Sequence, residues 1–316
     1  MALCVLSRDR WDELAPQLPA GGELDRCGTI WVAAAADELA VAEQRAIVYH
    51  AAGIGAEVIS AADLRRLEPA LAPHLAGGLL VPGDSVCYPP AIAHALSERI
   101  AAGGGMVRVG AAVRAVRSHA VDLDDGTSLR ADAIVVAAGV QSPALIPELP
   151  VVPRKGHLVI SDRRPGMVHH QVVEQGYLKS AHSFGGASVA FNVQPRRTGQ
   201  MLIGSSRELV GLDPRVNRRV VDAMLARAAE FLPGIDAVRA LRTWVGFRPA
   251  TADKLPLIGR WPALDGVWIA TGHEGLGITM STGTADLIVS AVLNTAPPID
   301  PAPFRPDRTM PALAAA

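Results

Sequence analysis

The feature that most restricts the fold is a buried strand, a glycine-rich loop and an apolar helix that follow one another near the C-terminus. Residues 266–272 read GVWIATG, an apolar run typical of a strand covered on both faces. The next residues, HEGLG, expose backbone amides, and a helical pattern begins at about Ser281. Free amides at a helix start stabilise negative charge. The loop therefore predicts a site for an anionic or electron-rich ligand, although glycine loops also precede helices in unrelated folds.

Composition excludes several classes of protein. The 316 residues include 30 basic and 31 acidic side chains, so nothing favours a nucleic acid or an acidic membrane as a partner. Three separated cysteines (Cys4, Cys27 and Cys87) form neither a CxxC pair nor a zinc cluster, which suits a reducing cytoplasm. The apolar runs are too short for a membrane span, and residues 1–14 do not resemble a signal peptide. We expect a soluble cytoplasmic protein without a metal or an integral membrane segment.

The periodicities predict an α/β chain. Residues 133–137 read as a buried strand that ends at Gly139, and a turn is expected at Asp125-Gly126. The segments GHLVISD, ASVAFNV and QMLIGSS predict an antiparallel sheet in the middle third. A helix is predicted from a cap at Asp213 to Pro233-Gly234, and another before the glycines at 103–105. Their apolar stripes are Val216, Val220, Met224, Ala228 and Phe231 in the first, and Ile92, Leu96 and Ile100 in the second.

Arg248 is the candidate for binding a carboxylate. It lies in GFRPATADKLPLIG, where Pro249 restricts the local backbone. A guanidinium held in one direction can bind a carboxylate through two parallel hydrogen bonds. The alternative is a surface arginine that pairs with Asp253 or with solvent. Likewise, the strand before Gly139 is either an ordinary core strand or one that lets a nucleotide approach the backbone.

Taken together, these segments resemble the D-amino acid oxidase-like family of FAD-dependent oxidoreductases. The resemblance rests on the order VVAAGVQSP, GFRPATADKLPLIG, GVWIATGHEGLGITMSTGTADLIVSAV and PIDPAPFRPDR, and it is clear from about Pro82 to Arg308. The middle segment VAFNVQPRRTGQMLIGSSRELVGLD resembles the substrate domain of hydroxyproline and proline dehydrogenase subunits. Gln141 departs mildly from the aromatic residue that relatives often have before Ser-Pro.

The resemblance implies FAD as cofactor and oxidation of a small amino or imino acid of the D-hydroxyproline, proline, glycine or sarcosine type. Hydride would pass from the substrate carbon to flavin N5 and leave an imine, with Arg248 on the substrate carboxylate and no dedicated catalytic base. Tyr177 and His182 would line the substrate pocket, or else serve packing or the surface. His273 would be a loop residue near the flavin and not an acid–base catalyst. The implied cofactor-binding residues are Val113, Ala138, Gly139, Gly272, His273, Glu274, Gly275, Leu276, Gly277, Ile278 and Thr279.

One departure from the family pattern concerns the dinucleotide. A strand, GxGxxG and a helix should open such a protein, but the nearest string here, GIGAEV at 53–58, has Val58 at the third glycine and precedes a strand-like segment. A late reading-frame start, a gene remnant or a unit supplied by another chain would each explain this. We expect the 316-residue chain to bind FAD poorly by itself and to expose a sheet edge.

The sequence thus predicts an FAD-binding Rossmann-like domain that lacks its first βαβ unit, together with a β-rich antiparallel substrate domain. Three alternatives remain: a non-catalytic fragment or subunit that needs a partner or an N-terminal unit, a flavin-independent carboxylate-binding module, and, within the enzyme class, an oxidase or a dehydrogenase with an electron-accepting partner subunit. The expected boundaries are 1–81 for a mainly substrate-domain segment with connecting helices, 82–150 and 243–300 for the FAD-binding domain, 151–242 for the substrate domain, and 301–316 for the tail.

Overall fold

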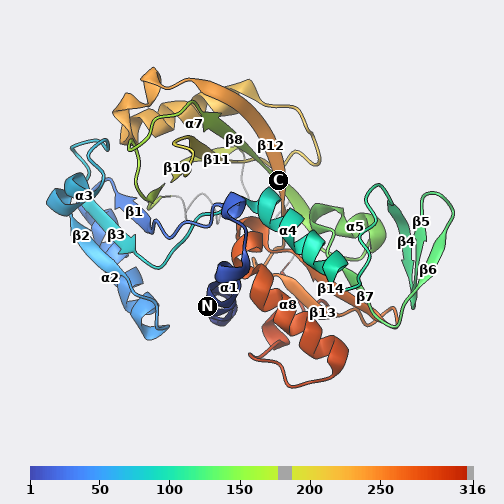
Figure 1. The fold of residues 1–316 in the computed structure, drawn as a ribbon. Helices are drawn as coiled ribbons and strands as arrows, with labels where there is room; N and C mark the ends of the chain where they lie inside the picture. The colour runs from blue at the N-terminus through green and yellow to red at the C-terminus, as the bar shows by residue number, and fades with distance from the viewer. Residues whose placement is uncertain (177–186, 312–316) are drawn as a thin grey trace. The chain divides into compact units, whose positions relative to one another are not determined.

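The computed structural model describes residues 1–176 and 187–311, and Figure 1 draws its fold as a ribbon. The chain forms two compact units. Unit 1 comprises Met1–Leu18, Pro89–Arg154 and Phe247–Ala315. Unit 2 comprises Pro19–Tyr88 and Lys155–Gly246. The segment 1–81, expected to belong mainly to one domain, is therefore divided, and its first 18 residues belong to unit 1.

Unit 1 contains the two strands that the sequence marks as buried. β14 (Val267–Thr271) pairs in parallel with β7 (Ile134–Val136) and antiparallel with β13 (Leu257–Arg260), which gives the sheet order β13-β14-β7. Val267 and Ile269 are fully buried. β7 is one of the two edge strands of this sheet, and its Val135 is 44% exposed. The apolar pattern of β7 therefore predicts a strand correctly, but not its position at an edge.

The helix after the glycine loop is α8 (Gly277–Leu293), and it packs against the N-terminal helix α1 (Ala2–Leu14), as Figure 1 shows. Ser7 of α1 is buried and accepts a hydrogen bond from the Gly283 amide at 3.1 Å. The Thr282 hydroxyl donates to the Ser7 carbonyl at 2.8 Å. Trp11 donates its indole N–H to the Ile278 carbonyl. These contacts make the first 14 residues an integral part of unit 1.

Gly283 permits this close approach of the two helices. A Cβ at this position would lie 2.5 Å from Ser7 Oγ and 3.0 Å from Leu3 Cδ1. We expect Gly283→Ala to lower the free energy of unfolding by about 1–3 kcal/mol, because the helices must move apart. Denaturant unfolding would measure the loss. Gly277→Ala is the matched control in the same helix, since its added methyl group would meet only His273 Cβ at 3.6 Å. Equal midpoints for the wild type and Gly283→Ala would contradict the close packing.

Unit 1 also contains a small antiparallel sheet, and α4 precedes it in the chain. Gly126 has φ +87° in the turn between the second and third strands, as expected for the Asp125-Gly126 turn. The stripe predicted for α4 is wrong at its end: Ile92 is buried, but Ile100 is 54% exposed in the last turn before the glycines at 103–105. The elements are α4 (Pro89–Ala102), β4 (Val113–Arg117), β5 (Ala120–Leu123), β6 (Ser128–Arg130), and the short helix α5 (Ser142–Leu145).

Unit 2 is built around an eight-stranded sheet of order β12-β8-β11-β10-β9-β1-β3-β2. The predicted antiparallel arrangement of the middle third is confirmed, because β11 pairs antiparallel with both β8 and β10. β1 and β9 form a parallel pair. The strands are β1 (Thr29–Ala33), β2 (Glu57–Ser60), β3 (Gly77–Val81), β8 (Val152–Ser161), β9 (Gln171–Glu174), β10 (Ser188–Pro195), β11 (Met201–Arg207) and β12 (Ala240–Ala250).

Helix α7 (Arg218–Phe231) packs its apolar stripe against this sheet, and Phe231 stacks on Phe191 with ring centroids 4.9 Å apart. The predicted cap at Asp213 is wrong, because the helix begins after Asn217 and the Asp213 carboxylate is engaged by Lys155 and Arg215. Val216 consequently lies before the helix and is 45% exposed. Two further helices belong to unit 2, α2 (Ala36–Ala51) and α3 (Ala61–Leu67). The buried stripe is Val220, Met224, Ala228 and Phe231.

Two expectations from the sequence concern metal binding and a membrane span. Over residues 1–176 and 187–311, no group of three or more metal-ligating side chains is found, and the three cysteines are free. One helical stretch, Glu274–Leu293, is long and apolar enough to cross a membrane by length and composition alone. That is weak evidence for a span, because core helices pass the same test.

Candidate functional site

The glycine loop connects β14 to α8 through a short 3-10 turn, Glu274–Leu276. Gly272 has φ +81°, and a Cβ there would lie 2.8 Å from Thr251 Cγ2 and 3.3 Å from the Leu257 amide nitrogen. This position therefore requires glycine on both conformational and steric grounds. Gly275, Leu276 and Ile278 are exposed. The loop thus combines a tightly packed base with accessible backbone at its tip.

Arg248, near the end of β12, lies against this loop. A Cβ on Gly275 would be 3.7 Å from Arg248 Cδ and 3.8 Å from Arg248 Nε, so the stem of the arginine runs along the Gly275 backbone. Asp253, which the sequence offers as an alternative partner, accepts two hydrogen bonds from Arg308, at 2.7 and 2.8 Å. The structure therefore brings the candidate carboxylate-binding arginine and the candidate ligand loop together within unit 1.

A second arginine reaches the same loop. Arg154, in β8, has a side chain that is only 4% exposed, and its Nη1 lies 3.4 Å from Oε1 of Glu274. The other oxygen of Glu274 accepts the Gly275 amide. Sequence reasoning missed Arg154, since it precedes the loop by 120 residues and no local pattern marks it.

His273 is a neutral residue in this site. Its Nε2 lies 2.9 Å from the Thr284 hydroxyl of α8, and burial lowers its pKa to about 4. An imidazole with so low a pKa is neutral near pH 7 and carries only one ring proton, so His273 is not a protonated, cationic acid there. His273 lies in the loop directly before the Glu274–Leu276 turn, and the expectation that it is not an acid–base catalyst stays a prediction.

The low pKa of His273 has a consequence for stability. Because the folded pKa lies below the unfolded value, the unfolded state takes up the proton first, and stability falls as the pH decreases from about 6.5 towards 4. Between pH 7.5 and pH 5, we expect the free energy of unfolding to fall by about 2 kcal/mol more in the wild type than in His273→Asn. Denaturant unfolding at the two pH values would measure both changes. Equal losses in the two proteins would contradict burial of a neutral imidazole.

The end of β7 lies next to the end of β14. The Thr271 hydroxyl of β14 donates to the carbonyl oxygen of Gly139 at 2.9 Å. Gly139 has φ +56°, and a Cβ there would meet nothing within 4 Å, so the backbone after Ala138 faces open space. Val113, the predicted adenine contact, begins β4 and is 36% exposed. The predicted pocket residues Tyr177 and His182 lie outside the described residues.

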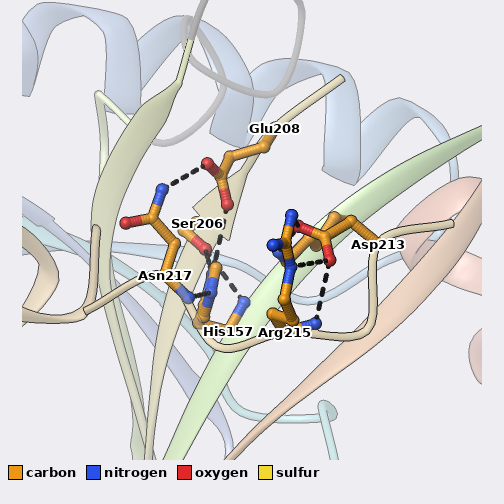
Figure 2. Close-up of polar contacts among 7 residues, drawn as sticks. His157, Ser206, Glu208, Asp213, Arg215 and Asn217 are labelled. Carbon is orange, nitrogen blue, oxygen red and sulfur yellow. Dashed lines mark hydrogen bonds and ion pairs between the residues drawn. The ribbon is translucent and has the colours of Figure 1, made fainter. Parts of the chain in front are cut away.

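Unit 2 contains a separate polar cluster (Figure 2). His157 is fully buried, with Nδ1 2.9 Å from the Ser206 hydroxyl and Nε2 3.0 Å from the Asn217 backbone amide. Because an amide can only donate, Nε2 is the acceptor and Nδ1 carries the ring proton. His157 therefore donates to Ser206 and cannot remove its proton. The Asn217 side chain donates to Glu208 at 2.9 Å, so the cluster anchors the start of α7 and does not form a nucleophilic triad.

Comparisons with known proteins place these features in one family. A sequence profile described as FAD dependent oxidoreductase (DAO) matches residues 1–291. Glycine oxidase from Pseudomonas aeruginosa is 31% identical over 182 residues, covering 56% of this chain and 46% of that protein. D-amino acid dehydrogenase from Chromohalobacter salexigens is 32% identical over 267 residues, covering 79% and 59%.

The fold agrees with these sequence matches. The crystal structure of glycine oxidase from Geobacillus kaustophilus superposes with a TM-score of 0.87 at 27% identity, covering 98% of this chain and 83% of that one. The L-proline dehydrogenase structure from P. horikoshii gives a TM-score of 0.84 at 17% identity, which indicates a shared fold. The chain spans about half the length of the first curated relatives, 46% and 49%.

Proposed function

The chain belongs to the FAD dependent oxidoreductase (DAO) family, and we propose that it carries the substrate-carboxylate and flavin-ring part of an enzyme that oxidises a small amino or imino acid. The observation that supports the proposal best is the packing of Arg248 along Gly275 in the loop before α8. Substrates of the D-hydroxyproline, proline, glycine or sarcosine type are the candidates. Relatives named glycine oxidase and D-amino acid dehydrogenase are in keeping with this class.

The residues present suit the ring end of FAD. The first-turn amides of a helix that begins at Gly277 have no acceptor within that helix and can face an electron-rich ring. The open backbone at Gly139, joined to Thr271, leaves space where β7 ends. Over the whole 316-residue sequence, no GxGxxG turn between a strand and a helix provides donors for the two phosphates. We therefore propose that these residues hold the flavin ring while another segment holds the diphosphate.

In the proposed reaction, Arg248 binds the substrate carboxylate and thereby fixes the direction of the Cα–H bond. FAD, when bound, would supply the acceptor for the hydride. The amides of Gly277, Ile278 and Thr279 would stabilise negative charge that develops on the ring. His273 is neutral beside Thr284, and we assign it no proton transfer; a reaction without a dedicated base requires the substrate to bind with a neutral amine.

The electron acceptor distinguishes two versions of this enzyme. An oxidase would consume oxygen with each of these substrates, whereas a dehydrogenase would reduce an added dye, and its natural acceptor would be a partner subunit. We propose the dehydrogenase version with proline-type substrates, because the segment at residues 189–213 resembles the substrate domain of hydroxyproline and proline dehydrogenase subunits. Oxygen uptake that matches substrate turnover, without any dye, would overturn this choice. The three free cysteines suit a cytoplasmic location, which is part of the proposal.

A second candidate is a non-catalytic fragment or subunit that binds FAD only with a further segment or partner. It is favoured by β7, whose continuous apolar sequence is typical of a central strand although it forms the sheet edge with Val135 exposed. A tight partner on co-purification, with no turnover by this chain alone, would support this candidate.

A further inference from the structure

Glu274 adopts a backbone conformation that residues other than glycine rarely adopt. Its φ is +49°, and Gly272, two residues earlier, has φ +81°. Glycine at position 274 would avoid the steric cost of the left-handed region. A strained residue of this kind persists where its surroundings offset the strain, and such residues concentrate at functional sites. The side chain of Glu274 is therefore the feature to be explained.

The Glu274 carboxylate links a buried cation to the loop backbone. Oε1 lies 3.4 Å from Nη1 of Arg154, and Oε2 accepts the Gly275 amide. The exposed fractions of the two side chains are 4% for Arg154 and 21% for Glu274, so the pair is largely shielded from water. Shielding strengthens the ion pair and the charge-assisted hydrogen bond.

We propose that Arg154 and Glu274 form a positioning pair that sets which amides of the loop can face a ligand. Arg154 extends from β8 and fixes the carboxylate, and the carboxylate occupies the Gly275 amide. The next amide, of Leu276, donates to the His273 carbonyl at 3.1 Å. Both amides are thus engaged within the loop.

The pair therefore restricts ligand-facing donors to the first turn of α8, at Gly277, Ile278 and Thr279. It also keeps the Gly275 backbone where the stem of Arg248 packs. Gly275 itself would shape the surface that faces the ligand but would not donate a hydrogen bond to it. The identity of the ligand as a flavin rests on the proposed function, whereas the Glu274–Gly275 contact does not.

Amide hydrogen exchange of the 316-residue chain tests the contact without any cofactor. In a ¹⁵N-labelled sample, we expect the Gly275 amide to exchange at least about tenfold more slowly in the wild type than in Glu274→Gly, because a hydrogen bond to a charged acceptor protects it. Glycine tolerates φ +49°, so this variant removes the carboxylate without adding backbone strain. Glu274→Gln, which keeps the shape but not the charge, should give an intermediate rate.

Two further variants separate positioning from general stability. Arg154→Met should also speed exchange at Gly275, since it leaves the carboxylate unanchored. Asp286→Asn is the matched control in the same unit, because it breaks the 2.6 Å ion pair between Arg10 and Asp286 on α1 and α8. That variant should leave the Gly275 amide unchanged. Unchanged exchange in both Glu274→Gly and Arg154→Met would overturn the proposal, as would an equal effect of Asp286→Asn.

The consequence for the cofactor is tested in a fusion protein that joins a glycine-rich strand–turn–helix unit of a family relative to Met1. We expect Arg154→Met to weaken FAD binding by this fusion protein about tenfold, measured by quenching of flavin fluorescence, and Asp286→Asn to leave it unchanged. If Gly275 exchange responds to Arg154→Met but FAD affinity does not, the positioning pair stands and the flavin role of the loop fails. If the exchange test fails, the proposed positioning pair is overturned, whatever the measured FAD affinity.

Discussion

Arg248→Ala should reduce kcat/KM for the amino-acid substrate about 10²- to 10³-fold in the FAD-loaded fusion protein, while the flavin content stays unchanged. Truncating one partner of a hydrogen-bonded charge pair costs about 2–5 kcal/mol, and 1.4 kcal/mol corresponds to a factor of ten. Arg248 is partly buried and lies along Gly275, so a substrate carboxylate bound there would be shielded from water. The loss should affect KM and kcat together, because the same contact binds the substrate and aims its Cα–H bond.

Two matched variants make this prediction specific. Arg248→Lys keeps the charge but cannot bind a carboxylate in the bidentate manner of a guanidinium. Its activity should therefore lie between those of the wild type and Arg248→Ala. Arg260→Ala removes an arginine of the same unit that is 61% exposed and pairs with Asp265, and its activity should be normal. Normal kcat/KM in Arg248→Ala would remove the central substrate contact from this account.

FAD retention should differ by about 10²- to 10⁴-fold in affinity between the 316-residue chain and the fusion protein. The chain contains no GxGxxG turn to hold the diphosphate. Two charge-assisted hydrogen bonds to phosphate are worth about 3–6 kcal/mol, and this sets the size of the difference. After mixing with FAD and desalting, we expect the chain to be nearly colourless and the fusion protein to keep a flavin absorption band.

A fusion protein in which only the second motif glycine, the one that lets the backbone approach the diphosphate, is replaced by alanine separates phosphate binding from simple completion of the sheet. It can still cover the edge of β7, where Val135 is 44% exposed, but its backbone cannot approach the diphosphate. We expect it to be as stable as the parent fusion protein but to lose the flavin. Stoichiometric flavin in the 316-residue chain alone would contradict the need for the added unit.

The fold could be predicted best where one local pattern decides it. The apolar runs at 133–137 and 266–272 predicted β7 and β14, and the stripe from Val220 to Phe231 predicted the buried face of α7. The start of α7 was wrong because Asp213 is a good cap by type but is held by Lys155 and Arg215. The Lys155 contact joins residues 58 positions apart and leaves no local signal.

In the candidate site, too, local motifs could be predicted but contacts between distant residues could not. The loop at 272–279 and Arg248 were predicted from their motifs, and the structure places them together. The pairing of Arg154 with Glu274 could not be predicted, because it joins residues 120 positions apart and depends on a left-handed glutamate. The edge position of β7 was equally hidden, since an apolar run gives the strand type but not its neighbours.

Anaerobic reduction of the bound flavin is the most direct test of whether the protein oxidises amino acids. The FAD-loaded fusion protein would be mixed without oxygen with D-proline, hydroxyproline, sarcosine or glycine, and its visible absorption followed. We expect at least one of these amino acids to bleach the flavin band, and the flavin of Arg248→Ala to bleach far more slowly under the same conditions. A flavin that dithionite reduces but none of these amino acids does would contradict the proposed amino-acid oxidoreductase.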